Sequence, residues 1–185
     1  MTSNLFLTGR IKCGKSTLIK QEITPYLDDV GGYFVQRLFC SGENCGFKML
    51  EIANREDYVL EKEINSIHEE KDLVVYLSDD GQWDFSVKTF EETGADILER
   101  AINSEKKLVL MDELGKVEQH APRFRSMVKK LLDSPVSVLG VIKKKENPFL
   151  NAVRERDDVF VIDLDTWEYQ DAVEKVRSYI KVVSG

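Results

Sequence analysis

Residues 4–16 read Asn4-Leu5-Phe6-Leu7-Thr8-Gly9-Arg10-Ile11-Lys12-Cys13-Gly14-Lys15-Ser16, and this stretch decides the fold. The apolar residues before Gly9 predict a short buried strand. After the glycine-containing loop, apolar side chains recur at helical spacing as far as Leu27. A strand, a loop of this spacing and a helix, in this order, predict a P-loop at the start of an α/β domain.

The loop meets the spacing G-x-x-x-x-G-K-S in full from Gly9 to Ser16. Its glycines allow a tight turn in which backbone N–H groups approach phosphate oxygens, and the following helix directs its positive dipole end to the same point. We expect Lys15 to reach the β- and γ-phosphates, the Ser16 hydroxyl to bind Mg²⁺ and Thr17 to contact the α-phosphate. The loop therefore predicts binding of a nucleoside triphosphate with Mg²⁺.

The variable positions of the loop carry further chemistry, and we assign all of residues 9–17 to nucleotide binding. Arg10 and Lys12 add two positive charges beside the phosphates. These charges either strengthen phosphate binding or project into solvent. Cys13 is either a small side chain that fills space or a reactive thiol.

The composition is that of a globular protein. The chain has 185 residues, 42% of them hydrophobic, which predicts one domain over residues 1–185 with a sizeable core. The net charge of −7 argues against a broad face for nucleic acid, because such a face is basic. No apolar run approaches the ~20 residues that span a bilayer, and residues 1–4 lack the pattern of a signal peptide. We expect a cytoplasmic protein with no membrane partner, and the sequence indicates no protein partner.

The cysteines number three, and an odd number argues against a secreted disulfide framework. Cys40 and Cys45 flank a Ser-Gly-Glu-Asn turn and are placed to face each other across a hairpin. A metal site needs more ligands than Cys13, His68 and His120 supply. We therefore expect plain reduced thiols.

The rest of the chain alternates between strand and helix patterns. Residues 33–35 and 46–52 predict a β-hairpin around a turn at 41–44, residues 73–77 predict a strand, and the charged segment 61–72 is expected on the surface. Farther on, strands are expected at 107–111, 136–142 and 159–162, and helices at 95–103, 124–132, 148–156 and 169–182. Strands separated by helices predict a three-layer α/β fold, with a mostly parallel sheet covered on both faces and an inserted β-hairpin.

An acidic pair follows the buried strand predicted at 107–111. Four apolar residues and then Asp112 form the Walker B pattern, which brings a carboxylate to the edge of the sheet beside the P-loop. There Asp112 is expected to hold Mg²⁺, usually through a coordinated water. Glu113 is then placed to orient or deprotonate an attacking water.

Asp112-Glu113-Leu114-Gly115-Lys116-Val117-Glu118 resembles the D-E-[IL]-G-K-[MV]-E signature of a small family of P-loop nucleoside-triphosphatases, of the cancer-related and thermophile type. Weaker similarities extend over nearly the whole chain, at Gly32-Tyr33-Phe34 with Gly46-Phe47, at Thr89-Phe90-Glu91-Glu92 and at Asn147-Pro148-Phe149. The resemblance implies a RecA-like P-loop fold and slow, Mg²⁺-dependent hydrolysis of ATP, GTP and other nucleoside triphosphates. It also implies catalytic roles for Lys15, Glu113 and Lys116, although Lys116 also suits a surface position.

The chain departs from that family pattern at three places. The family loop reads G-x-P-G-x-G-K-T-T, and here Ile11 and Lys12 stand in place of the proline and the second glycine. Arginines of the family hairpin are absent, with Arg37 as the nearby candidate. The family's Asn-Arg pair after the last strand, which is associated with the base, is replaced by residues 163–167. Trp167 in that segment either stacks on a base or packs internally.

Three functions fit these patterns. The first is hydrolysis of a nucleoside triphosphate with water as the acceptor. The second is a nucleotide or small-molecule kinase, which needs an acceptor pocket and mobile arginines, with the candidates Arg123, Arg125, Arg154 and Arg156. The third is a nucleotide-dependent switch with negligible catalysis. A Ras-type GTPase is disfavoured because no N-K-x-D segment follows the predicted sheet.

Overall fold

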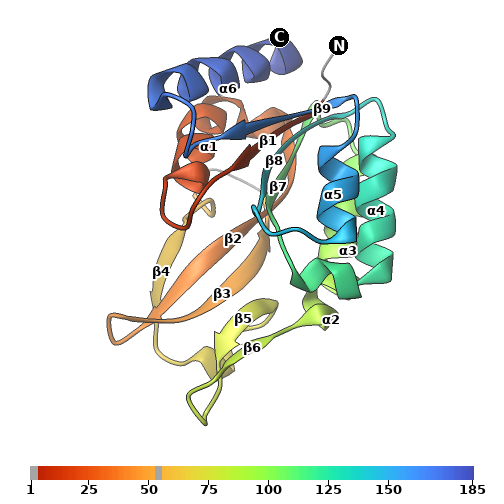
Figure 1. The fold of residues 1–185 in the computed structure, drawn as a ribbon. Coiled ribbons are helices and arrows are strands. Elements are labelled where there is room, and N and C mark those ends of the chain that lie inside the picture. The colour runs from red at the N-terminus through yellow and green to blue at the C-terminus, as the bar shows by residue number, and fades with distance from the viewer. Residues whose placement is uncertain (1–3, 53–55) are drawn as a thin grey trace.

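The computed structural model describes residues 4–52 and 56–185. Within these residues nine strands form one sheet, in the order β6-β5-β3-β2-β7-β8-β1-β9, and β4 pairs with β2 (Figure 1). The strands in chain order are β1 (Asn4–Thr8), β2 (Val30–Cys40), β3 (Glu43–Glu51), β4 (Glu61–Ile64), β5 (Leu73–Leu77), β6 (Trp83–Phe85), β7 (Leu108–Leu114), β8 (Ser137–Ile142) and β9 (Val159–Asp163).

The helices cover both faces of this sheet. On one face lie α1 (Lys15–Ile23) and α6 (Tyr169–Ser184), and on the other lie α3 (Ala95–Ile102), α4 (Pro122–Leu132) and α5 (Pro148–Arg154) (Figure 1). Shorter elements are α2 (Val87–Thr89), a π-helical turn at Phe90–Gly94, and 3-10 turns at Thr24–Asp29, Ile67–Glu69 and Val117–His120.

The core is divided by the sheet into two buried clusters. Along β1, Leu5 and Leu7 pack in the cluster under α1 and α6, whereas Phe6 packs in the cluster under α3, α4 and α5. Successive side chains of a strand point to opposite faces, so a strand that is apolar at every position is buried on both sides. The predicted three-layer α/β fold is therefore confirmed.

Strands β7, β8, β1 and β9 are parallel to their neighbours, and β2 is parallel to β7. The antiparallel part consists of the predicted hairpin β2–β3, extended at its side by β5 and β6. Because parallel strands end at the same edge, the segments that follow β1, β7, β8 and β9 meet there. This edge holds the predicted P-loop and the acidic pair.

Several predicted boundaries are corrected. The first helix ends at Ile23, and a 3-10 turn covers the residues up to Asp29, because Pro25 has no N–H group to continue the α-helical bonding. The strand β7 does not stop at Met111 but continues through the acidic pair to Leu114. Strands β4 and β6 were not predicted, since both are short and their side chains are largely exposed.

The expectation of reduced thiols is wrong for two of the cysteines. Cys40 and Cys45 form a disulfide, whereas Cys13 is a free thiol. The hairpin turn explains the pairing, because it brings the two Cα atoms to 5.7 Å, within the range that a disulfide spans. Their predicted position across the hairpin is confirmed.

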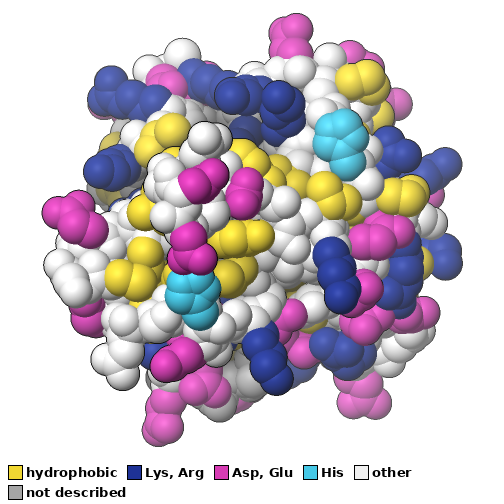
Figure 2. Space-filling model, turned by 90° about the horizontal axis from the view of Figure 1, so that it is seen from below, with side chains coloured by type: hydrophobic (Ala, Val, Ile, Leu, Met, Phe, Trp, Pro, Cys, Tyr) yellow, Lys and Arg dark blue, Asp and Glu magenta, His cyan; other side chains and the backbone are white. Residues whose placement is uncertain are grey.

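Charged side chains of both signs lie on the face drawn in Figure 2. Several basic side chains gather along its upper edge, acidic side chains are spread over the rest, and hydrophobic side chains lie between them. Among the helices of residues 4–52 and 56–185, none has both the length and the apolar character needed to cross a bilayer.

We expect Gly32→Ala to destabilise the fold severely. Gly32 has φ +95°, and a Cβ added there would lie 2.1 Å from the backbone oxygen of Leu110, its partner across the β2–β7 pairing. The free energy of unfolding in urea should fall by roughly 4 kcal/mol or more, the range of the most disruptive substitutions.

Gly81→Ala is the matched control: its φ is +78° and nothing lies within 4 Å of the added atom. It should cost about 1 kcal/mol of backbone strain alone. Equal losses in the two variants would contradict this explanation.

Candidate phosphate-binding and catalytic site

The loop between β1 and α1 has the backbone of an anion-binding turn. Gly9 and Gly14 adopt φ values of +142° and +94°, which favour glycine. Lys12, which stands at a glycine position of the resembled family, also adopts a positive φ of +63°. The conformation that a glycine would take freely is thus kept here by a lysine, at a cost of about 1 kcal/mol.

Lys15 is held inside this loop. Its ammonium group donates hydrogen bonds to the backbone oxygens of Gly9, at 2.9 Å, and of Arg10, at 2.8 Å. Its Nζ also lies 3.5 Å from the Cys13 sulfur. A positive charge is therefore fixed at the start of α1, where the helix dipole also favours an anion.

The variable loop side chains point outward. Ile11 is 83% exposed, and Arg10 and Lys12 are exposed as well. Of the two alternatives for these cations, the structure favours projection into solvent. Cys13 is half-buried, and a Cβ added at Gly9 would lie 2.8 Å from its sulfur, which fits the space-filling alternative.

Ser16 and Asp112 meet although they lie 96 residues apart: the Ser16 hydroxyl donates to Asp112 Oδ1 at 3.2 Å. Asp112 is only 3% exposed, and its Oδ2 is buried without a hydrogen-bond partner among the described residues. Burial raises the pKa of Asp112 to about 7, the charge of Glu113 adds to this, and the Ser16 hydrogen bond and the Lys15 charge oppose it. A hydroxyl beside a carboxylate with an unpartnered oxygen suits Mg²⁺, which is commonly held by few protein groups together with phosphates and water.

Glu113 forms an ion pair with Lys143, in which Nζ lies 2.7 Å from Oε1. The side chains are 31% and 45% exposed, so the pair lies at the surface of the site. Burial lowers the pKa of Lys143, but the charge and hydrogen bond of Glu113 raise it by more, and Glu118 adds to the upward shift. The net effect keeps Lys143 charged at neutral pH.

Glu118, the last residue of the D-E-L-G-K-V-E run, is buried behind this pair. Burial raises its pKa to about 7, while hydrogen bonds from the backbone N–H groups of Glu118 and Gly115 and the charge of Lys143 lower it. The Glu118 carboxylate thus accepts hydrogen bonds from the backbone of the turn that follows β7. Its role is to hold the backbone that follows Glu113.

The segment after β9 is attached to the P-loop through Asp165. Its carboxylate accepts the Arg10 backbone N–H at 3.2 and 3.0 Å and pairs with Lys144 at 2.6 Å. Lys144 also pairs with Asp163 at 2.8 Å. The segment that replaces the family's Asn-Arg pair therefore supports the loop.

Residues 4–176 match the protein family described as NTPase. The chain belongs to this NTPase family. It is 30% identical over 181 residues to nucleoside-triphosphatase THEP1 of Thermotoga sp. (strain RQ2), covering 98% of this chain and 97% of that one. The THEP1 protein of Thermotoga maritima is 29% identical, with the same coverage.

Two solved structures share the NTPase family fold. The crystal structure of THEP1 from Aquifex aeolicus has a TM-score of 0.70 at 21% identity, covering 98% of this chain and 99% of that one. The solution structure of a human cancer-related nucleoside triphosphatase has a TM-score of 0.69 at 20% identity, covering 97% and 96%. The family resemblance and the fold predicted from the sequence are therefore confirmed.

Lys116, predicted to be catalytic from the NTPase family motif, is not a member of the Glu113 ion pair. It is exposed and forms no ion pair with any residue in the described part of the chain. It lines a surface pocket of about 350 Å³ together with Gln119, Lys145, Glu146 and Asn147. In the structure, Lys143 is the cation at Glu113, and sequence reasoning missed it, together with Lys144, Asp163 and Asp165.

The arginines considered for a kinase are largely engaged in structural contacts. Arg123 pairs with Asp96 and Glu99, and Arg156 pairs with Asp133 and Asp158. Arg154 donates to the backbone oxygens of Lys143 and Lys145. These contacts do not favour a set of mobile arginines.

Trp167 contacts Phe160 and remains 36% exposed. Its ring centroid lies 5.9 Å from that of Phe160, at an interplanar angle of 77°. This edge-to-face geometry is the favoured one for aromatic pairs. Trp167 therefore has a packing partner in Phe160, and part of its ring faces solvent.

We expect Glu118→Gln to stabilise the protein increasingly as the pH rises. The pKa of Glu118 is raised from 4.5 to about 7 by burial, so its protonated form is favoured in the folded state. The stability that this shift contributes is complete below pH 4.5 and is lost as the pH rises through about 7. Glutamine stays neutral, so the variant does not lose this stability as the pH rises. The difference in free energy of unfolding, variant minus wild type, should therefore grow by on the order of 2 kcal/mol from about pH 5 to about pH 8.

Urea unfolding at both pH values measures this difference. Asp112 titrates in both proteins and cancels in the comparison. The control Glu105→Gln removes an exposed carboxylate. A parallel rise in both variants would contradict the assignment to Glu118.

Proposed function

We propose that this chain is a Mg²⁺-dependent nucleoside-triphosphatase that converts a nucleoside triphosphate and water to the diphosphate and phosphate. The observation that carries the proposal is the Ser16–Asp112 contact of 3.2 Å, which joins the P-loop to the strand end that bears Glu113. Membership of the NTPase family and the names of the relatives support hydrolysis rather than transfer to another acceptor.

Each group of the site has its own role in the hydrolysis. The N–H groups of the loop, other than the Arg10 N–H that Asp165 accepts, and the Lys15 ammonium bind the phosphates and stabilise the charge that develops on them. A bound Mg²⁺, held by Ser16 and Asp112, would neutralise further phosphate charge. Glu113 accepts a proton from water as the water oxygen attacks the γ-phosphorus. The bond from that phosphorus to the β–γ bridging oxygen breaks, and its electron pair leaves with the diphosphate.

For the substrate we propose several nucleoside triphosphates with weak discrimination among bases. Two carboxylates, Asp163 and Asp165, stand where the resembled family has its Asn-Arg pair. Both are engaged by Lys144, and Asp165 also accepts the Arg10 N–H. Both carboxylates already have partners within the protein, so neither is reserved for a base. A site without dedicated hydrogen bonds to its substrate discriminates weakly.

Phosphate release with Mg²⁺ and each nucleoside triphosphate tests the hydrolase proposal. Lys15→Ala should abolish release, because it removes the fixed charge at the β- and γ-phosphates. Glu113→Gln should lower kcat by about 100-fold or more while nucleotide affinity is kept, the usual effect of losing a general base. Lys145→Met, an exposed lysine without an ion pair in the described residues, is the control and should retain activity.

Wild type that releases no more phosphate than Lys15→Ala would overturn the proposal. Release that depends on an added acceptor would point to a kinase instead. Tight nucleotide binding without release would point to a switch.

Asp112→Asn tests the metal role. The variant keeps the shape of the side chain and its contact with Ser16 but loses the negative charge. The Mg²⁺ concentration that gives half-maximal phosphate release should rise by about 10-fold or more, as happens when a metal ligand is weakened. Asp96→Asn, on the exposed side of α3, should leave it unchanged. An unchanged requirement in Asp112→Asn would contradict the assignment.

A further inference from the structure

Lys143 follows β8 directly, and its backbone is fixed on both sides. Its N–H donates to the backbone oxygen of Leu114 at 2.9 Å, which continues the β7–β8 pairing one residue beyond Glu113. Its own backbone oxygen accepts a hydrogen bond from the guanidinium of Arg154 on α5. The residue is thus part of the rigid edge of the sheet, although the segment after it is an exposed loop.

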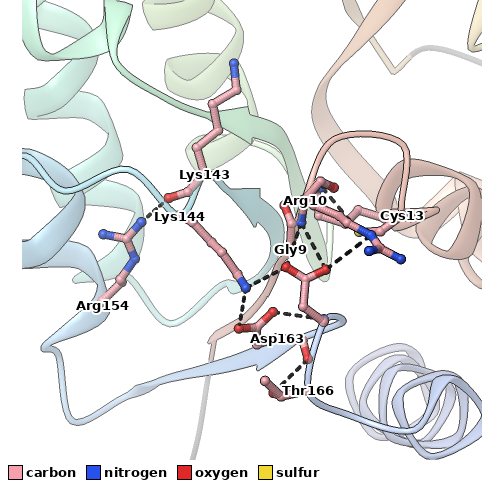
Figure 3. Close-up of polar contacts among 10 residues, drawn as sticks. Gly9, Arg10, Cys13, Lys143, Lys144, Arg154, Asp163 and Thr166 are labelled. Atoms are coloured by element: carbon pink, nitrogen blue, oxygen red, sulfur yellow. Dashed lines mark hydrogen bonds and ion pairs between the residues drawn. The ribbon is translucent and has the colours of Figure 1, made fainter.

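The side chain of Lys143 points away from that of its neighbour Lys144 (Figure 3). Lys144 reaches Asp163 and Asp165 beside the P-loop, whereas Lys143 reaches Glu113. The stem of Lys143 lies over Gly115, where an added Cβ would be 3.1 Å from Lys143 Cδ. Glycine at this position therefore leaves the space through which the lysine reaches the carboxylate.

Two carboxylates act on the same ammonium group. Glu113 Oε1 lies 2.7 Å from Nζ, and the buried Glu118 attracts it from the turn after β7. Within residues 4–52 and 56–185, Lys143 is the only cation that forms an ion pair with Glu113. One oxygen of Glu113 is occupied in this way, and the other is left for a different partner.

We propose that Lys143 is a positioning residue for Glu113, an inference that rests on the proposed hydrolytic function. Its ammonium holds Oε1, so that the carboxylate cannot rotate and Oε2 is directed to the attacking water. In the reaction, Oε2 accepts one proton of the water as the oxygen–phosphorus bond forms and the bond to the diphosphate breaks. Lys143 exchanges no proton and does not touch the nucleotide.

The geometry separates this role from a contribution to stability. Exposed ion pairs contribute little to folding, and Lys143 is 45% exposed in its side chain. Misplacement of a catalytic group by about 1 Å, in contrast, lowers turnover by as much as about 100-fold. Removal of the ammonium should therefore affect the rate far more than the fold.

The test compares Lys143→Met, Lys143→Arg and the control Lys145→Met in the full chain. Lys143→Met should lower kcat for phosphate release by about 10- to 100-fold, and KM should change by less than about 3-fold. The affinity for a non-hydrolysable triphosphate analogue and the urea midpoint of unfolding should stay close to wild type. Lys143→Arg keeps a cation at this position and should restore most of the turnover, whereas Lys145→Met should match wild type.

A double-mutant cycle shows whether Lys143 acts through Glu113. If it does, Lys143→Met combined with Glu113→Gln should be no slower than Glu113→Gln alone, because residues that act as a unit are not additive. Multiplied losses would overturn the proposal and assign Lys143 an independent action. Weaker analogue binding with kcat retained would also overturn it, since it would place the ammonium on the phosphates.

The failure of this inference is distinguishable from failure of the proposed function. Hydrolysis by wild type but not by Lys15→Ala, with Lys143→Met as fast as wild type, would overturn only the role of Lys143. Wild type no faster than Lys15→Ala would overturn both.

Discussion

The register of the parallel strands is the constraint on which the rest of the site depends. Val141 of β8 lies opposite Leu7 of β1 on one side and opposite Asp112 of β7 on the other, and Thr8 lies opposite Asp163 of β9. The strand ends are therefore level, and the groups that follow them reach one another. A shift by one residue would turn each side chain to the other face of the sheet. The buried clusters on both faces oppose such a shift, so core packing fixes the distances within the site.

Burial of the acidic groups lowers the stability of the fold but favours the chemistry of the site. Asp112 and Glu118 are almost inaccessible to water, and burial raises the pKa of each to about 7. A folded protein keeps such groups only where other contacts hold the structure firmly in place. Here the packing of the two buried clusters does so. Asp112 with an unpartnered oxygen is well prepared for a cation, because metal binding would relieve the cost of its burial. Glu118 has no such relief and is satisfied by backbone N–H groups instead.

The sequence was informative wherever the signal was local. The strand, loop and helix around residues 4–23, the acidic pair after β7 and the β2–β3 hairpin follow from spacing and periodicity. Lys143 did not, because one lysine in a run of three has no local mark. Its meeting with Glu113 depends on the pairing of β7 with β8, which composition and periodicity do not specify. Strands β4 and β6 were not predicted for a related reason: exposed edge strands are held by backbone pairing with a neighbour rather than by an apolar pattern.

The departures of the loop from its relatives are compensated by contacts elsewhere in the chain. Lys12 adopts the left-handed conformation that a glycine would take without strain, so the loop needs support from outside. Asp165 supplies it, by accepting the Arg10 N–H at the start of the loop, and Lys144 holds Asp165 in turn. The segment after β9 thus stiffens the phosphate loop, while its carboxylates are neutralised by cations. Adjacent lysines at the end of β8 thereby serve two ends of one site, Lys144 through the loop that binds phosphates and Lys143 through the carboxylate beside it.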